Sequence, residues 1–298
     1  MALVNQNNLE IFQDKEIFEI YFEYVKRKYK FKDLGNGFII RKVGKIRRLH
    51  YAIDDLIDWW DLDITKDEIE NILKSEIYFK AVFKNILENS NIKRVLDSLN
   101  FKPKNISFSK VYYINLFELN SQEKILKSLP YNQRKNIRNY KNRLKRVNYE
   151  FFRTQSLKPY KEKIIEFILK RHKNTKFSDL DFQKLKFRVL EILENRGMIY
   201  TYIMKIHKEI ASINVLIILN KKAYWWITAN DEKFYEFSPG RITVWFILED
   251  LLKEGFLEFN FMKGEAEYKT FWTNNFYKLY RYEFEPNFLK KVFSVFML

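Results

Sequence analysis

The chain has 298 residues, 47 % of them hydrophobic, which is enough apolar material for the cores of two ordinary domains. It contains no cysteine, which excludes disulfides and thiolate chemistry, and no apolar run reaches the length of a membrane-spanning helix. The net charge of +16 favours polyanionic partners such as nucleic acid, anionic lipid or nucleotide sugars, unless it only reflects lysines spread over solvated faces.

The first hundred residues predict a mixture of helices and short strands. Apolar residues at helical spacing predict helices at 10–30, 65–75 and 81–89, and a glycine-flanked stretch predicts a hairpin at 38–48. Thr65 and Glu68 have the spacing of a capping box, which predicts the start of the second helix. A break follows at 100–107. We therefore expect an N-terminal domain at 1–108 and a C-terminal domain at 109–298.

A basic helix is predicted after this boundary. The stretch 121–147 holds a short helix and then a longer one, whose cations Arg134, Arg138, Lys141 and Lys145 share one helical stripe. An apolar stripe lies beside it. Such a helix is either an anion-binding wall, for a phosphorylated donor, an acceptor or a nucleic-acid backbone, or a solvated amphipathic helix.

The remaining elements predict an α+β order. Strands are expected at 110–119, 149–153, 198–206, 210–219, 223–229 and 256–261, and helices at 157–172, 182–194 and 241–254. Short turns join the three strands at 198–229 into a meander, and the last helix lies between two strands. This order predicts helices packed on a sheet.

The start of the last helix offers a site for an anion. Ser238 is a favoured N-cap residue and Pro239 suits the first helical position. Gly240 lets another molecule approach the backbone, and Arg241 adds a cation. Unpaired N–H groups and the helix dipole favour a phosphate at such a position. The alternative is an ordinary capped helix on a sheet.

Groups suited to catalysis stand close together beyond the next strand. Gly264 provides a turn, and two carboxylates, a phenol and a cation follow at Glu265, Glu267, Tyr268 and Lys269. Base, acid and oxyanion-stabilising roles need these group types. The alternative is that Tyr268 packs into the core while the charges face water. The three histidines lack ligand spacing, so no metal site is predicted.

Two blocks of the sequence resemble a known family. One block comprises Ser238-Pro239-Gly240, Gly255, Phe259-Asn260-Phe261, Gly264, Tyr268-Lys269 and Trp272, and the other Leu129-Pro130, Gln133-Arg134, Asn136-Ile137-Arg138 and Arg143-Leu144. Both resemble the GNAT-related acyltransferases of the CelD type, found beside polysaccharide biosynthesis, which are similar in turn to the FemAB peptidyltransferases. The resemblance covers roughly residues 111–282, and it departs from the family at Asn260, where aspartate is common.

The resemblance implies a fold and a set of site residues. The fold is α+β, with a GNAT-like mixed sheet flanked by helices, in two tandem GNAT-like units of which the N-terminal one is degenerate. The donor, acetyl-CoA or another acyl-CoA, is expected at Ser238, Pro239, Gly240, Arg241 and Thr243. Lys269 is expected to stabilise charge, Tyr268 to donate, and Glu265 or Glu267 to act as the base. Substrate-binding residues are Arg134, Arg138, Asp54 and Asp55, although the aspartates also fit a solvated surface or a helix cap.

The implied function is acyl-CoA-dependent N-acyl transfer to an amino sugar or another cell-envelope precursor, by direct attack of the amine on the thioester. We expect a cytoplasmic protein, because the N-terminus lacks the order of a signal peptide. The acceptor would be a small-molecule amine or a nucleotide sugar; contact with tRNA or a membrane surface stays open, and no DNA partner is expected. Two alternatives remain: aminoacyl transfer from charged tRNA, and a non-catalytic scaffold or RNA-binding protein on the same fold.

Overall fold

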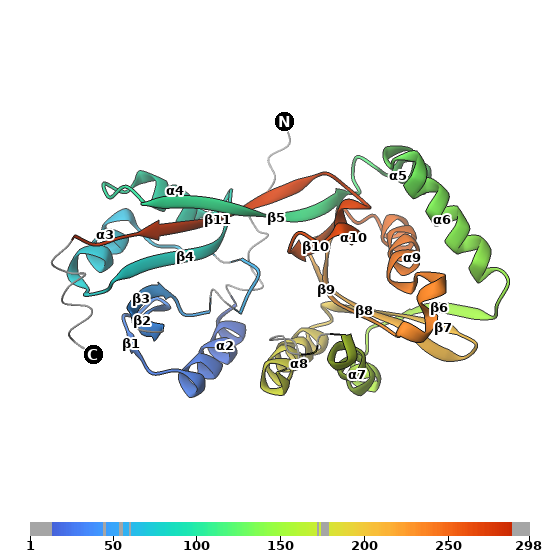
Figure 1. The fold of residues 1–298 in the computed structure, drawn as a ribbon, viewed down its shortest axis with the longest axis horizontal. Helices are drawn as coiled ribbons and strands as arrows, with labels where there is room; N and C mark the ends of the chain where they lie inside the picture. Colours follow the sequence, from blue (N-terminus) through green and yellow to red (C-terminus); the bar gives the residue numbers. More distant parts are fainter. Residues whose placement is uncertain are drawn as a thin grey trace. The chain divides into compact units, whose positions relative to one another are not determined.

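The computed structural model describes residues 14–43, 46–53, 56–59, 61–171, 173 and 179–287 (Figure 1). Contacts divide the chain into two compact units, unit 1 with Met1–Lys110 and Tyr277–Leu298, and unit 2 with Val111–Phe276. Unit 1 thus includes residues 277–298, which the sequence analysis assigned to the second domain. The predicted domain boundary at residue 108 stays a prediction.

Unit 1 contains a mixed sheet and three helices within its described residues. Its elements are α2 (Lys15–Lys28), β1 (Phe31–Asp33), β2 (Phe38–Val43), β3 (Ile46–Tyr51), α3 (Lys66–Ser75), β4 (Lys80–Leu87), α4 (Asn91–Ser98), the first part of β5 (Asn105–Asn115) and most of β11 (Phe276–Phe284). The strand order is β1-β2-β3-β4-β11-β5, and β3 and β4 are parallel. The predicted helix at 65–75 is confirmed, and so are the described parts of the helix at 10–30, as α2, and of the hairpin at 38–48, as β2 and β3; residues 10–13, 44 and 45 lie outside the described residues.

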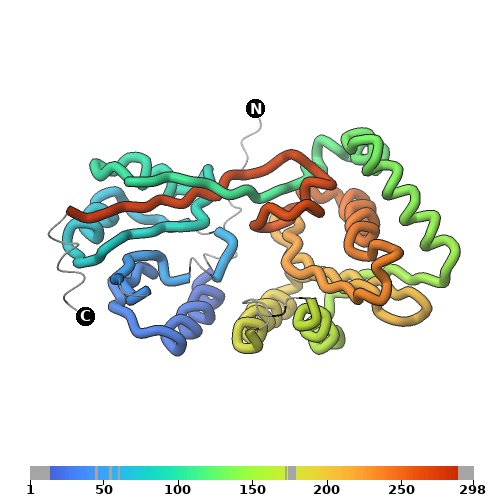
Figure 2. The backbone as a smooth tube through the Cα atoms, in the orientation of Figure 1, coloured from blue at the N-terminus to red at the C-terminus, as the bar shows by residue number. Residues whose placement is uncertain are grey.

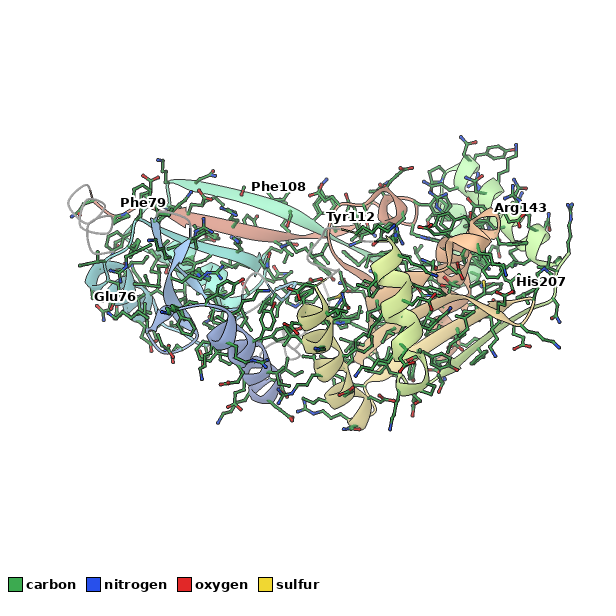
Figure 3. All side chains as sticks on the ribbon, turned by 60° about the horizontal axis from the view of Figure 1, so that its bottom comes forward. Glu76, Phe79, Phe108, Tyr112, Arg143 and His207 are labelled. Carbon is green, nitrogen blue, oxygen red and sulfur yellow. The ribbon has the colours of Figure 1, made fainter. Side chains whose placement is uncertain are left out.

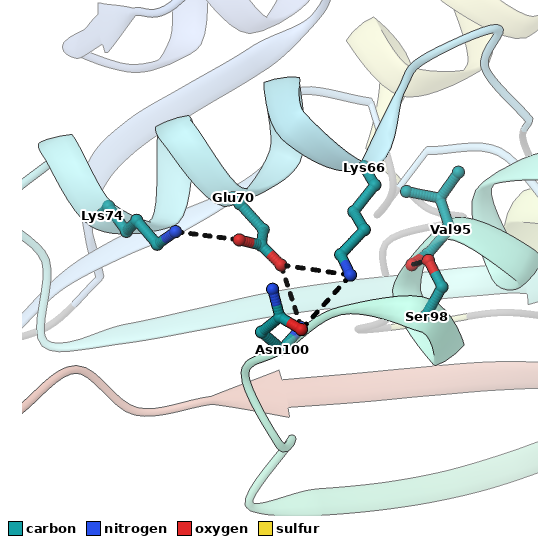
Figure 4. Close-up of polar contacts among 6 residues, drawn as sticks. All are labelled: Lys66, Glu70, Lys74, Val95, Ser98 and Asn100. Carbon is teal, nitrogen blue, oxygen red and sulfur yellow. Dashed lines mark hydrogen bonds and ion pairs between the residues drawn. The ribbon is translucent and has the colours of Figure 1, made fainter.

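Glu70 connects α3 to the segment after α4 (Figure 4). Its carboxylate accepts hydrogen bonds from Nζ of Lys74 and from the backbone N–H of Asn100, both at 2.9 Å. The hydrogen bond from Lys74, followed by that from Asn100, lowers the pKa of Glu70 from its usual 4.5 to about 2. The carboxylate therefore takes part in holding α3 in place.

The predicted helix at 81–89 is wrong, because these residues lie mostly in β4. Their apolar residues, at 81–83 and 86–87, recur at a spacing that also fits a helical stripe. The strand lacks simple alternation because it is irregular at Asn85, which has a φ of 60° and donates its side-chain amide to the carbonyl of Ile57 at 3.0 Å. A bulge of this kind shifts the inward-facing positions of a strand. The helix begins only at Asn91, as α4.

The strands of unit 2 also pair in both parallel and antiparallel orientation. Its elements are the rest of β5, then α5 (Gln122–Ser128), α6 (Tyr131–Leu144), β6 (Tyr149–Thr154), the 3-10 helix η2 (Lys158–Tyr160), α7 (Lys161–Arg171), α8 (Leu180–Asn195), β7 (Ile199–Ile206), β8 (Glu209–Leu219), β9 (Lys222–Asn230), the 3-10 helix η4 (Glu232–Phe237), α9 (Pro239–Lys253), β10 (Glu258–Lys263) and α10 (Glu267–Thr270). The strand order is β5-β10-β9-β8-β7-β6, in which β9 and β10 run parallel.

Helices cover both faces of the unit 2 sheet (Figures 1 and 2). α5, α6 and α9 share one core with the inner face of the sheet, and α7 and α8 contact β9 and β7 from the other side. α9 ends as predicted at Gly255, whose φ of 69° suits glycine. The N–H of Phe256 then reaches back to the carbonyl of Leu251 at 3.0 Å, as in a Schellman motif.

Polar contacts fix the second half of α9 on the sheet. Arg153 of β6 forms ion pairs with Asp250 at 2.8 Å and Glu254 at 2.5 Å, and its guanidinium lies 4.2 Å from the ring centre of Tyr200. The hydroxyl of Tyr202 donates to Asp250 at 2.7 Å. Burial and this hydrogen bond raise the pKa of Tyr202 above its ordinary value. The phenol therefore stays protonated and keeps donating to the helix.

One order of elements occurs twice along the chain. A helix, three strands, a helix, a strand, a helix and a strand run from α2 to β5, and again from α8 to β11. In each series the third and fourth strands are parallel and a helix connects them. The predicted α+β fold, with mixed sheet flanked by helices in two tandem units, is confirmed. Among the described helices, none is long and apolar enough to cross a membrane.

Candidate active site

A cavity of about 400 Å³ opens beside the first turn of α9 in unit 2. Its lining residues come from α7, β9, η4, the start of α9 and α10: Arg171, Trp225, Thr228, Asn230, Tyr235, Ser238, Pro239, Gly240, Arg241 and Tyr268. The volume falls in the range of small-molecule sites. Four of the residues predicted to bind the donor, Ser238 to Arg241, thus lie at one cavity together with Tyr268, which was predicted as a catalytic residue.

The cavity lies where β9 and β10 cease to pair. Over the residues of these two described strands, parallel pairing is limited to 222–224 of β9 and 258–260 of β10. β10 then becomes irregular at Met262, which has a φ of 60°, and its register with β5 shifts. Asn260 accepts the N–H of Met262 at 2.9 Å. Asn260 therefore stabilises the bend in β10.

The first turn of α9 offers an anion fewer free backbone N–H groups than the sequence suggested. Ser238 occupies the N-cap position, but it is left-handed, with a φ of 50°, and its side chain makes no capping hydrogen bond. Its carbonyl accepts the N–H groups of Arg241 at 2.9 Å and Ile242 at 3.0 Å. Proline has no N–H. Within the described part of the chain, Gly240 is left with a first-turn N–H that no backbone or side-chain oxygen accepts.

Two arginines give the cavity a positive potential. Arg241 donates from its guanidinium to the hydroxyl of Tyr140 in α6 at 3.2 Å and lies 5.0 Å from the ring centre of Phe271. Arg171, at the end of α7, is exposed. Among the described residues that line the cavity, none is acidic. The arrangement therefore favours an anionic ligand, with Arg241 held in place before it binds.

Polar residues of β8 and β9 form the floor beneath α9. Ser212 and Asn214 of β8 lie opposite Asn230 and Thr228 of β9 in the antiparallel register. Asn214 accepts the indole N–H of Trp225 at 3.0 Å and donates to Ser212 at 2.9 Å. The sequence analysis missed this floor. Its signal was present, since polar residues alternate with apolar ones in strands that are otherwise buried.

Aromatic rings close the apolar side of the cavity. The ring of Trp225 lies 5.6 Å from the rings of Phe261 and Tyr268 and 5.9 Å from that of Phe259. Tyr268 stands nearly perpendicular to Trp225, at 89°. Such edge-to-face contacts hold the phenol of Tyr268 in a defined position at the cavity wall.

Lys269 and Thr243 have partners away from the cavity. The ammonium of Lys269, only 3 % exposed, donates to the carbonyls of Met262 and Lys263, both at 2.8 Å. The hydroxyl of Thr243 donates to the carbonyl of Pro239 within α9 at 2.6 Å. Neither residue lines the cavity. In this structure Lys269 holds the bend at the end of β10, and Thr243 the first turn of α9.

The predicted carboxylates are not part of the cavity wall. Glu265 and Glu267 are exposed, in the loop before α10 and in its first turn. They are one to three residues from Tyr268 in the chain, on the segment that forms one side of the cavity. Asp54 and Asp55 lie outside the described residues.

The longer, basic helix predicted within 121–147 is present as α6, but its arginines differ in role. Arg134 donates to the carbonyl of Leu129 at 3.0 Å, at the end of α5, and Arg143 to the carbonyl of Glu236 at 2.6 Å (Figure 3). Arg138 is exposed. Neither Arg134 nor Arg138 lines the cavity, so these two predicted substrate-binding residues stand apart from the donor-site residues.

Histidines take structural positions where the structure describes them. His50 is buried, with Nδ1 2.8 Å from the carbonyl oxygen of Tyr51, and His207 lies in the turn between β7 and β8 (Figure 3). His172 lies outside the described residues. No group of three or more metal-ligating side chains is found within the described ranges.

Comparison with known proteins agrees with this geometry. A family model described as an acetyltransferase (GNAT) domain matches residues 131–270, which include α6, the meander, α9 and β10. No curated protein matches the sequence significantly.

Three solved structures are similar over most of their length. FemX has a TM-score of 0.56 and 10 % sequence identity, and the match covers 92 % of this chain and 93 % of FemX. The C-terminal domain of a putative lysylphosphatidylglycerol synthetase from Agrobacterium fabrum has a TM-score of 0.54 and 11 % identity, with 94 % of each chain covered. L-PGS from Bacillus licheniformis has a TM-score of 0.51 and 12 % identity, with 95 % of this chain and 96 % of L-PGS covered. Such low identities establish a shared fold alone. The chain therefore has a FemAB-like GNAT fold. Its residues 131–270 are the part that matches the acetyltransferase domain.

Proposed function

We propose that the chain is an N-acyltransferase that moves an acyl group from acyl-CoA, most simply acetyl-CoA, to an amine. The observation that carries this proposal is the cavity between the first turn of α9 and the part of β9 that lies beyond its pairing with β10. It lies inside the part of the chain that matches a GNAT acetyltransferase domain. Its two arginines and the N–H of Gly240 suit the phosphates of the donor.

The reaction would need no enzyme nucleophile. The amine nitrogen attacks the thioester carbonyl carbon, the C–S bond breaks, and the amine passes a proton to a base. Tyr268, at the cavity wall, would donate a proton to the departing thiolate. The described lining residues include no carboxylate that could take the amine proton. Glu265 or Glu267, which stand close to Tyr268 in the chain, would therefore be the base. Lys269 would act by fixing the bend in β10 beside the reacting carbonyl, because its ammonium donates to the carbonyls of Met262 and Lys263.

The resemblance to the CelD type suggests the acceptor. We propose an amino sugar or a related cell-envelope or polysaccharide precursor, carried in the cell as a phosphorylated or nucleotide-linked molecule. The exposed cations of α6, including Arg138, would attract such an anion before it reaches the cavity.

Calorimetric titration with acetyl-CoA and with free CoA tests the donor site. Wild type should bind both, and Gly240→Trp should bind neither, because the indole would occupy the cavity. Lys253→Trp, at the exposed far end of the same helix, is the matched control and should bind like wild type. Absence of binding to wild type would refute acyl-CoA as the donor.

Aminoacyl transfer from charged tRNA is the second candidate. It is favoured by the fold likeness to FemX and lysylphosphatidylglycerol synthetase, together with exposed cations on α6. Wild type would then bind aminoacylated tRNA with strong salt dependence, and Arg138→Glu would weaken that binding. RNA binding without turnover of either donor would point instead to a non-catalytic RNA-binding protein.

A further inference from the structure

Asn230 presents a buried polar atom to the cavity. Its side chain is 8 % exposed and lines the cavity at the end of β9. The amide nitrogen Nδ2 donates to the hydroxyl of Thr228 at 3.2 Å. The amide oxygen Oδ1 accepts no hydrogen bond from the described residues. This oxygen faces the first turn of α9, where a β-carbon on Gly240 would lie 3.5 Å from it.

An amide oxygen buried without a donor lowers the stability of the folded chain. Asn214, across the sheet from Thr228, shows the contrasting case, since Trp225 donates to its oxygen at 3.0 Å and its nitrogen donates to Ser212 at 2.9 Å. The amide oxygen and the amide nitrogen of Asn214 thus both have partners within the protein. Asn230 lines the cavity, and its amide oxygen has no hydrogen-bond donor among the described residues.

We propose that Asn230 makes the cavity select a donor that carries an N–H group, because its Oδ1 receives a hydrogen bond from that group, which a plain phosphate ester lacks. This inference rests on the proposed function and adds the recognition of the donor to it. The N–H of Gly240 and the guanidinium of Arg241 bind an anionic group at the first turn of α9, while Asn230 binds an N–H group beside it. The donor therefore carries both an anion and an N–H.

Two donors supply this chemistry. Coenzyme A carries amide N–H groups in its pantetheine arm, and an aminoacyl ester carries an ammonium group beside its reactive carbonyl. Either would satisfy Oδ1. A plain phosphate ester or nucleotide would occupy the anion site alone.

Binding measurements on Asn230→Leu, a substitution of similar size without an acceptor, test the inference with coenzyme A and 3′,5′-ADP. The variant should bind coenzyme A about 10- to 100-fold more weakly, the loss expected for an unpaired hydrogen bond. Its affinity for 3′,5′-ADP should stay within about twofold of wild type, because this nucleotide lacks the pantetheine amides. Equal weakening of both ligands, or of neither, would overturn the inference.

A second pair of probes separates the amide from the ammonium. An adenosine with an amide-linked amino acid at its 3′ position mimics an aminoacyl ester, and acetylation of its amino group removes the positive charge. Asn230→Asp keeps the acceptor and adds a negative charge. If the natural partner is an ammonium, Asn230→Asp should bind the charged probe more tightly than wild type does and discriminate more strongly against the acetylated one. If it is a pantetheine amide, only coenzyme A responds to Asn230→Leu.

Thermal unfolding of the ligand-free protein gives a readout that needs no ligand. Asn230→Leu should raise Tm by about 2–4 °C, because removal of the unsatisfied Oδ1 outweighs the loss of the long hydrogen bond from Nδ2 to Thr228. Asn214→Leu, the matched control, should lower Tm, because it breaks two internal hydrogen bonds. If no probe binds wild type, the proposed function and the inference fall together, whereas wild-type binding of coenzyme A that Asn230→Leu leaves unchanged overturns the inference alone. A lower Tm for Asn230→Leu would make Asn230 a structural residue and would also overturn the inference.

Discussion

A β-carbon on Gly240 would lie 3.1 Å from Nδ2 of Asn230, closer than such atoms ordinarily approach. The contact joins the first turn of α9 to the end of β9, and both residues line the cavity. Gly240 lies in the first turn of a regular helix, so glycine serves here for space rather than for an unusual backbone. Any larger residue would press on the amide of Asn230.

Gly240→Ala should therefore weaken donor binding without unfolding the chain. The methyl group displaces the carboxamide by a few tenths of an ångström and disturbs its hydrogen bond to Thr228. We expect a loss of affinity of about tenfold in calorimetric titration. Tm should stay level or rise, because alanine favours a helix over glycine. An unchanged affinity would show that Asn230 tolerates the shift or does not contact the donor.

Arg153→Met should destabilise unit 2 by about 1–3 kcal/mol, since it leaves Asp250 and Glu254 without their partner in a half-buried setting. Methionine keeps apolar contact with Tyr200, so the effect isolates the charge. Chemical denaturation measures it. Lys253→Met, which loses an exposed pair with Glu249, is the control and should change stability by less than about 0.5 kcal/mol.

α9 and the three-strand meander could be predicted because their signals are local. Pro239 and Gly255 mark the two ends of the helix, and short turns at His207 and Asn220 adopt the left-handed backbone of tight hairpins. β4 could not be predicted, because a bulge at Asn85 changes its apolar spacing, and the bulge depends on partners far away in the sequence. Residues 80–87 therefore form a strand because of tertiary contacts and not because of their local sequence.

The sequence could place residues together at the cavity where they follow one another in the chain, but not where neighbouring strands bring them together. Ser238 to Arg241 are consecutive, so their joint position at the cavity follows from one helix start. Asn230 and Asn214 lie near each other only through the register of β8 and β9. The two carbonyl partners of the Lys269 ammonium depend on the irregular backbone at Met262. Backbone irregularities of that kind leave no clear sequence signal.

Arg134→Ala should lower stability by about 1 kcal/mol, because the carbonyl of Leu129 at the end of α5 loses its donor. Arg138→Ala, on the exposed face of the same helix, should leave stability within about 0.5 kcal/mol. The affinity for a phosphorylated acceptor should show the reverse order, with Arg138→Ala losing more affinity than Arg134→Ala. Equal stability in both variants would mean that the Arg134 contact contributes little.

Lys269→Met should affect both stability and turnover. Loss of the two hydrogen bonds to Met262 and Lys263 costs about 1–3 kcal/mol and lowers Tm. If the bend in β10 positions the reacting carbonyl, turnover well below Tm should also fall by about 100-fold, while donor affinity changes little. Full turnover at low temperature with a lowered Tm would show that Lys269 is only structural.

Glu70 should make unit 1 sensitive to acid. Its pKa is lowered to about 2 by the hydrogen bonds from Lys74 and Asn100, whereas in the unfolded chain it returns to its usual 4.5. The folded state therefore binds fewer protons than the unfolded one between these values, so the contribution of Glu70 is complete above pH 4.5 and is lost as the pH falls toward 2. Glu70→Gln should lower Tm at neutral pH and flatten the decline of Tm on the acid side, as measured by circular dichroism. Glu19→Gln, on the exposed face of α2, should keep the decline of wild type, and an equally steep decline in Glu70→Gln would assign the acid sensitivity to other carboxylates.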